Sequence, residues 1–172
     1  MDFFKVVRER RSVRSFEDRP VPRGNIESCL NAARLAPSGT NAQPWRFLVI
    51  REAEKRRLRA EAGFNQPCLR EAPVITVLFG DRGLYKKRLR RAKELSDIGA
   101  LSQDTLSTLE VNYAKRDSKD LNDQKIAMNC MLAGAPYALA ASALRLCSCW
   151  VRPLACQHST DSGGNDAQKQ FL

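Results

Sequence analysis

Residues 37–44 restrict the local fold strongly, because Pro37 and Pro44 enclose the small polar segment Ser-Gly-Thr-Asn-Ala-Gln. Proline resists helix interiors and sheet ladders, and the enclosed residue types favour tight turns. Before this segment, apolar residues at helical spacing predict a helix from about residue 23 to 36. After it, the apolar run 45–50 predicts a strand. A polar loop therefore joins a helix to a strand.

Two further helices and a second strand are expected on either side of these elements. Asp2 can cap a first helix, and a charged helix over 52–62 would stop at Gly63, which is a typical C-terminal signal. The run 73–79 is short, β-branched and apolar, which predicts a central strand buried on both faces.

The C-terminal half of the chain is expected to contain one long apolar helix. Asp123 can cap this helix, which would run to Leu146 with an interruption at Pro136. A final strand is expected at 149–151, and residues 157–170 are almost free of apolar side chains. This last composition predicts a disordered tail.

The length and composition fit one globular domain. The chain has 172 residues, enough to bury a core. No apolar run approaches the ~20 residues of a membrane helix, and the N-terminus lacks the apolar region of a signal peptide. We therefore expect a cytoplasmic protein with no membrane partner, whose six cysteines are mostly thiols.

The net charge of +10 is concentrated in two stretches. Residues 51–59 interleave basic side chains with glutamates, which is typical of a solvated helix face. Residues 86–93 contain no acid and could attract a phosphate-bearing partner, but a solvated helix is the preferred interpretation. No aromatic residues are interleaved there, so we expect no nucleic-acid partner.

A third cluster of basic residues lies directly after the first helix. Arg10, Arg11 and Arg14 accompany Ser12, and guanidinium groups with a hydroxyl could grip a phosphate or a ribityl chain. Taken alone, this cluster is better interpreted as a solvated basic turn, because arginine-rich helix ends are common. In the 37–44 loop, small residues would let the backbone approach a planar ligand, and Asn41 and Gln43 offer amides that suit a heterocyclic edge.

The two segments together resemble the nitroreductase superfamily of FMN enzymes. That family carries an Arg-Arg-Ser-x-Arg-x-Phe segment, then a helix, then Ala-Pro-Ser-x-x-Asn-x-Gln-Pro-Trp and a strand. This chain has Arg-Arg-Ser-Val-Arg-Ser-Phe at 10–16 and Ala-Pro-Ser-Gly-Thr-Asn-Ala-Gln-Pro-Trp at 36–45. Ala-Pro-Val at 72–74 and Cys-Trp-Val at 149–151 also match.

The resemblance implies an α+β fold, with a mixed, mainly antiparallel sheet flanked by helices, and an intertwined homodimer that holds FMN at the subunit interface. Positions matching Arg10, Ser12 and Arg14 would contact the phosphate, the ribityl chain and the pyrimidine edge of the flavin. Those matching Pro37, Ser38, Gly39 and Asn41 would come from the other subunit and pack on the ring, and the segment around Cys149 and Trp150 would lead past it. The cofactor-binding residues expected are Arg10, Arg11, Ser12, Arg14, Pro37, Ser38, Gly39, Asn41, Gln43, Cys149 and Trp150.

The same resemblance implies hydride transfer from NAD(P)H to the flavin and then reduction of a nitroaromatic, a quinone or a similar small acceptor. The cofactor supplies this chemistry, so no catalytic side chain and no metal are expected.

The sequence departs from the family pattern near its C-terminus. Family members usually continue for several tens of residues beyond the Cys-Trp pair, whereas here the composition turns polar after Leu154. The family's Gly-Leu-Gly appears as Arg-Leu-Cys at 145–147, and Pro136 interrupts the long helix. We therefore expect an FMN-binding domain over 1–154 and a polar tail over 155–172, and a shortened form could bind FMN poorly and be non-catalytic.

Other functions are compatible with parts of the sequence. Iodotyrosine deiodinase and the flavin-destroying enzyme of vitamin B12 ligand synthesis share the arginine motif, and the first uses a Glu-Tyr-Lys lid. Glu110, Tyr113 and Lys115 have these types, but their spacing does not match. A different class is a zinc module, whose candidate ligands are Cys147, Cys149, Cys156 and His158.

Overall fold

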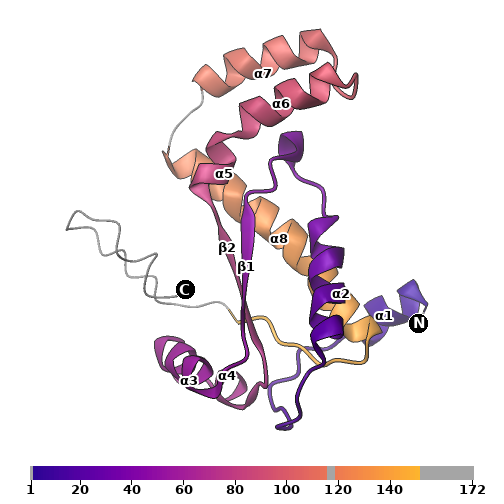
Figure 1. The fold of residues 1–172 in the computed structure, drawn as a ribbon, viewed down its shortest axis with the longest axis vertical. Coiled ribbons are helices and arrows are strands. Elements are labelled where there is room, and N and C mark those ends of the chain that lie inside the picture. Colours follow the sequence, from indigo (N-terminus) through magenta and orange to yellow (C-terminus); the bar gives the residue numbers. More distant parts are fainter. Residues whose placement is uncertain (1, 116–118, 152–172) are drawn as a thin grey trace, which may run out of the picture.

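The computed structural model describes residues 2–115 and 119–151. The tail predicted for 155–172 lies outside these residues. The elements in chain order are α1 (Phe3–Glu9), α2 (Arg23–Arg34), the 3-10 turn η1 (Gly39–Asn41), β1 (Trp45–Ile50), α3 (Ala53–Ala62), α4 (Pro67–Glu71), β2 (Ile75–Gly80), α5 (Arg82–Lys86), α6 (Arg88–Asp97), α7 (Gln103–Lys115) and α8 (Lys119–Ala143). Figure 1 shows β1 and β2 as a ribbon beside α8, with α3 and α4 at one end and α5 to α7 at the other. The fold is α+β, as predicted.

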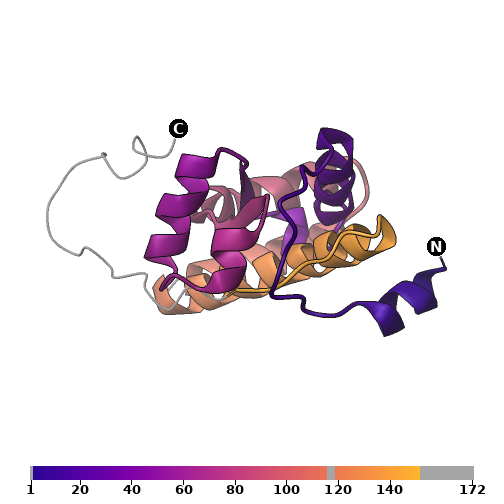
Figure 2. The same cartoon turned by 90° about the horizontal axis from the view of Figure 1, so that it is seen from below.

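The N-terminal half follows the sequence pattern closely. The Asp2 carboxylate accepts a hydrogen bond from the backbone N–H of Lys5 at 3.0 Å, which caps α1. Strand β1 has the bounds predicted, and Gly63 ends α3. Helix α2 ends at Arg34, two residues before the predicted limit. Helix α1 projects from the rest of the chain and buries only Val6 (Figure 2).

The sheet is smaller than the sequence predicted. In the described chain β1 pairs only with β2, antiparallel, from Trp45 opposite Gly80 to Ile50 opposite Ile75. Strand β2 is therefore not a central strand buried on both faces, and Phe79 is 44% exposed. The β-branched residues predicted the strand correctly, but residues 2–115 and 119–151 bring no further strand against it.

The long helix also differs from its prediction at the start and in the middle. It begins at Lys119, so Asp123 lies inside it, and the Asp123 carboxylate accepts two hydrogen bonds from Arg82 at 2.7 and 2.5 Å. Pro136 does not end the helix. Proline removes the donor for the carbonyl four residues earlier, and Leu132 at that position is 48% exposed, so water can replace the donor.

The end of α8 has the hydrogen bonds of a Schellman motif. The N–H of Leu146 donates to the Ala141 carbonyl at 2.9 Å, and the N–H of Arg145 donates to the Ser142 carbonyl at 3.0 Å. Arg145 has φ of 59°, in the left-handed region. The chain then turns back along α8.

No strand forms at 149–151, contrary to the prediction. Ser148 makes an isolated parallel bridge with Ser12, and the N–H of Val13 donates to the Ser148 carbonyl at 3.1 Å. The apolar residues 149–151 pack against other elements and do not form the backbone hydrogen bonds of a strand.

Two apolar clusters divide the core between the two ends of the ribbon. The first consists of Ala36, Ala42, Trp45, Tyr85, Ile126, Cys130 and Ala133. The second consists of Ile50, Ala60, Cys68, Leu69 and Ile75, with Phe16, Leu48, Val77 and Val151 packed against it. Below they are called the α8 cluster and the α3–α4 cluster.

Among the described helices, α8 alone is long and apolar enough over Leu121–Ala143 to cross a membrane, by length and composition only. The sequence pattern did not identify this segment, because polar residues interrupt its apolar run. Only 33% of its most apolar window is buried within the protein. A core helix passes the same test, so this finding by itself is weak evidence for a membrane span.

Candidate flavin site

The basic segment after α1 presents donors that this chain does not use. The Nη1 atom of Arg10 is buried and has no hydrogen-bond partner. Arg14 is exposed, and none of the ion pairs in the described chain includes Arg10, Arg11 or Arg14. Arg11 instead donates to the carbonyls of Arg8 and Arg10, at 2.6 and 3.0 Å. A buried, unpartnered guanidinium nitrogen fits an anionic ligand, since leaving such a donor unsatisfied is costly.

The C-terminal segment lies against this basic segment. The bridge between Ser12 and Ser148 places Cys149 and Trp150 next to it in the fold. Trp150 packs over Gly134 of α8, and a β-carbon there would lie 3.0 Å from the Trp150 Cζ2 atom. Trp150 nevertheless remains 44% exposed. The structure thus brings together two of the three predicted parts of the site.

The third part, the loop at 37–43, has an unusual backbone. Thr40, Asn41 and Gln43 have φ of 51°, 50° and 43°, all in the left-handed region that non-glycine residues seldom adopt. The Gln43 N–H donates to the Ser38 hydroxyl at 3.0 Å, and the Gln43 side chain donates to the Arg34 carbonyl at 3.4 Å. Ser38 and Gln43 are therefore engaged in holding the loop. Clusters of such strain are typical of ligand sites.

The outer face of this loop is open. Pro37, Gly39 and Asn41 are exposed, and a β-carbon on Gly39 would meet nothing within 4 Å. The Gly39 N–H donates to the side chain of Asn129 on α8 at 3.3 Å, which ties the loop to that helix. A planar ligand could approach the backbone here.

These parts occupy opposite ends of α2. The basic segment precedes α2, and the loop with η1 follows it at the other end (Figure 1). One copy of the chain therefore does not bring all the predicted site residues together.

A buried arginine beside the loop was not predicted. Arg88 is 7% exposed, and its guanidinium carbon lies 4.5 Å from the ring centroids of both Tyr85 and Tyr113. The Tyr113 hydroxyl lies 3.4 Å from the Thr40 hydroxyl. The basic run 86–93 is thus mostly solvated, as expected, but Arg88 is a core residue. The spacing of Tyr85 and Arg88, one helical turn apart, was the available signal.

The described residues do not form the deiodinase lid or the zinc site considered as alternatives. Glu110 pairs with Lys93 at 3.2 Å, and Tyr113 stacks on Arg88, so neither is free to form the lid considered above. Of the zinc candidates, Cys147 and Cys149 are free thiols, while Cys156 and His158 lie outside the described residues.

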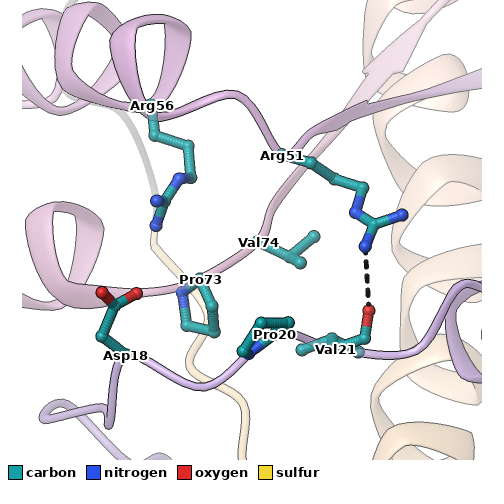
Figure 3. A pocket seen from close by; sticks show the side chains of 7 residues that line it. All are labelled: Asp18, Pro20, Val21, Arg51, Arg56, Pro73 and Val74. Carbon is teal, nitrogen blue, oxygen red and sulfur yellow. Dashed lines mark hydrogen bonds between the residues drawn. The ribbon is translucent and has the colours of Figure 1, made fainter.

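Figure 3 shows a cavity of about 130 Å³ that is separate from the predicted site residues. Arg51 and Arg56 lie on its rim, where Arg51 donates to the Val21 carbonyl at 3.2 Å and Arg56 to the Ala72 carbonyl at 2.6 Å. Ligand pockets usually measure ~300–1,000 Å³, so this cavity is too small for a flavin. It is lined by Asp18, Pro20, Val21, Arg51, Arg56, Pro73 and Val74.

Comparison with known proteins supports the motifs at the family level. The Nitroreductase family profile matches residues 7–158. A relative named NADH dehydrogenase from Thermus thermophilus is 45% identical over 73 residues, covering 42% of this chain and 36% of its own length. The iodotyrosine deiodinase of Drosophila melanogaster is 44% identical over 55 residues, covering 31% of this chain and 19% of its own length. This chain spans about half the length, or less, of the first five curated relatives it matches.

The fold is similar to that of solved family structures. A protein from Exiguobacterium sibiricum, named as a nitroreductase and solved in complex with FMN, superposes with a TM-score of 0.68 at 26% identity. The match covers 83% of this chain and 70% of that one. With the family profile matching most of the sequence, these likenesses show that the chain belongs to the nitroreductase family.

Proposed function

We propose that the protein is an FMN-dependent oxidoreductase that uses NAD(P)H to reduce nitroaromatic, quinone or similar acceptors. The observation that carries this proposal is the buried, unpartnered Nη1 atom of Arg10, next to Ser12 and the exposed Arg14. An anionic cofactor would supply the missing partner. The FMN complex of the Exiguobacterium sibiricum relative supports the choice of flavin.

When bound, FMN would accept a hydride at N5 and pass electrons on to the acceptor. Arg10, Arg11 and Arg14 would hold its phosphate and the electron-rich edge of its ring through charge-assisted hydrogen bonds, and Ser12 would hold the ribityl chain. The loop at 37–43 would pack on the ring with the open backbone face at Gly39. Cys149 and Trp150 would border the cofactor beside Ser12. No side chain need act as nucleophile or base.

We propose that the site forms in a homodimer, because its proposed parts lie at opposite ends of α2 within one chain. Exposed apolar side chains support a second copy: Met128 and Met131 on α8 are 68% and 57% exposed, and Phe3 and Phe4 on α1 are 61% and 68% exposed. Exposed apolar surface of this kind often marks a protein interface. We propose that Pro37, Ser38, Gly39, Asn41 and Gln43 of one copy complete the site of the other.

The remaining proposals concern the organisation and the location of the chain. The FMN-binding domain would span 1–154, with the polar tail over 155–172. The protein would work in the cytoplasm on a small-molecule acceptor, without metal, nucleic acid or membrane.

Reconstitution tests the proposal directly. Purified protein incubated with FMN and then desalted should retain a visible flavin band, and NADH or NADPH should bleach it without oxygen. Retention without bleaching would support a flavin-binding protein that is not an NAD(P)H oxidoreductase. Absence of bound flavin at micromolar FMN would contradict the proposed site.

The deiodinase alternative is tested with the same sample. Reductive release of iodide from iodotyrosine by the flavin-loaded protein would favour it. We expect no release, because Glu110 and Tyr113 are engaged with Lys93 and Arg88.

A further inference from the structure

Two cysteines that are far apart in the sequence meet at the α3–α4 end of the molecule. Cys68 lies in α4 and is 6% exposed, and Cys149 follows Ser148 and is half-buried. Burial, and after it an interaction with the Cys149 side chain, raises the pKa of Cys68, which indicates that the two thiols lie close together. Both are free thiols in the structure.

The contact is held by the packing around it. On one side of Cys149, Ser148 is bridged to Ser12, and on the other side Val151 packs against the α3–α4 cluster, which contains Cys68. The N–H of Phe16 also donates to the Glu71 carboxylate on α4 at 3.1 Å. The two thiols are therefore neighbours because several independent contacts place their segments together.

We propose that Cys68 and Cys149 form an internal disulfide by exchange with a low-molecular-weight disulfide such as oxidised glutathione. Cys149 also borders the proposed flavin site, but the disulfide proposal rests on the packing of the two cysteines and not on bound flavin. Its consequence is a covalent link between the Cys-Trp segment and α4.

The two cysteines differ in exposure, and this sets the order of the steps. Cys149 is the more accessible, so its thiolate attacks the small disulfide, forms a mixed disulfide and releases one thiol. Burial, with a further contribution from Cys149, raises the pKa of Cys68. Cys68 therefore stays protonated until it attacks the Cys149 sulfur, losing its proton to solvent and releasing the second small thiol. One disulfide is consumed and two thiols are produced, so the electrons balance.

Peptide mapping tests the proposal on the full-length protein. After incubation with oxidised glutathione, the wild-type chain should lose two titratable thiols and the mass of two hydrogen atoms, and digestion should yield a peptide linking Cys68 to Cys149. Dithiothreitol should restore both thiols.

Two variants test whether Cys149 pairs with Cys68 or with the nearby Cys147. Cys68→Ser should stop at a stable glutathione adduct on Cys149, because the second thiol is missing. Cys147→Ser is the matched control, since Cys147 is exposed two residues away, and it should behave as the wild type. A link between Cys149 and Cys147 or Cys156, a persistent adduct in the wild type, or no oxidation at all would overturn the proposal.

Discussion

At the scale of single residues, Arg145 occupies a position that suits glycine. Its φ of 59° places it at the left-handed position of the Schellman motif that ends α8. The family pattern has Gly-Leu-Gly where this chain has Arg-Leu-Cys, and the structure gives the first of those glycines a physical reason. A β-carbon in this conformation costs about 1–2 kcal/mol.

Arg145→Gly should therefore stabilise the protein by about 0.5–1 kcal/mol, since the relief of strain exceeds the added entropy of the unfolded chain. Urea unfolding followed by circular dichroism measures the change. Arg145→Ala keeps the β-carbon and should give no gain. Equal stabilisation by both variants would show that loss of the guanidinium, and not of backbone strain, is responsible.

Arg10 provides the residue-scale test of the flavin site. Its buried Nη1 has no partner, and a charge-assisted hydrogen bond is worth about 1.5–3 kcal/mol. Arg10→Ala should weaken FMN binding by roughly ten- to a hundredfold, measured by flavin fluorescence titration. We expect Arg14→Ala to act in the same direction.

Arg57→Ala is the charge-matched control for this titration. Arg57 lies on α3, where its side chain is 56% exposed and pairs with Glu54 and Glu61. Its loss should leave FMN affinity nearly unchanged. If Arg57→Ala and Arg10→Ala weaken binding equally, the effect comes from general electrostatics.

Residue types predicted which side chains would form the site, but not the contacts that each makes within the chain. The motif at 36–45 identified Ser38 and Gln43, yet their groups hold the loop through contacts with Arg34 and with each other. Arg88 was read as part of a solvated run because its partner Tyr113 is distant in sequence. Tertiary neighbours of this kind leave no local pattern.

At the scale of elements, the packing of α8 against the Cys-Trp segment depends on Gly134. A β-carbon there would overlap the Cη2 atom of Trp150, and it would lie 3.0 Å from the Trp150 Cζ2 atom and 3.1 Å from the Leu78 side chain. In a helix interior, replacing glycine by alanine normally stabilises the helix by about 1 kcal/mol. Here the contact should reverse that sign, because overpacking typically costs about 1–3 kcal/mol.

Gly134→Ala should therefore lower the free energy of unfolding by about 1 kcal/mol and shift tryptophan fluorescence to longer wavelength, as Trp150 moves into water. Adding Trp150→Ala removes the clash, so Gly134→Ala should be neutral or stabilising in that background. If Gly134→Ala is equally destabilising in both backgrounds, Trp150 does not occupy this space.

The boundaries of helices and strands were predictable where the sequence signal for them was local. Asp2, Gly63 and the run 45–50 each mark their element through nearby backbone or side-chain chemistry. Asp123 resembled a helix cap but pairs with Arg82, which comes from a different helix. The apolar residues 149–151 resembled a strand but pack against helices, because apolarity indicates burial and not ladder pairing.

At the scale of the whole molecule, the proposed dimer should depend on the exposed face of α8. Met131→Glu places a charge on a side chain that is 57% exposed here and would be buried between two copies. The wild type should sediment at about twice the 19.3 kDa chain mass, and the variant near one chain mass with loss of bound FMN. A desolvated, unpaired charge at an interface is strongly unfavourable.

Leu58→Glu on α3 is the matched control, since Leu58 is 50% exposed and α3 carries none of the side chains proposed for the interface. It should remain dimeric and flavin-loaded. A monomeric wild type that binds FMN would contradict the two-chain site.

The division of the core between the two ends of the β1–β2 ribbon also governs how the molecule opens. The α8 cluster rests on a helix of 25 residues, whereas the α3–α4 cluster depends on helices of 10 and 5 residues and on the segments containing Phe16 and Val151. Local unfolding usually proceeds in cooperative units of this size. The α3–α4 end is thus the weaker unit, and its amide protons should exchange with solvent while those of α8 remain protected. Such an opening would release the stretch around Cys149 without unfolding the rest of the chain.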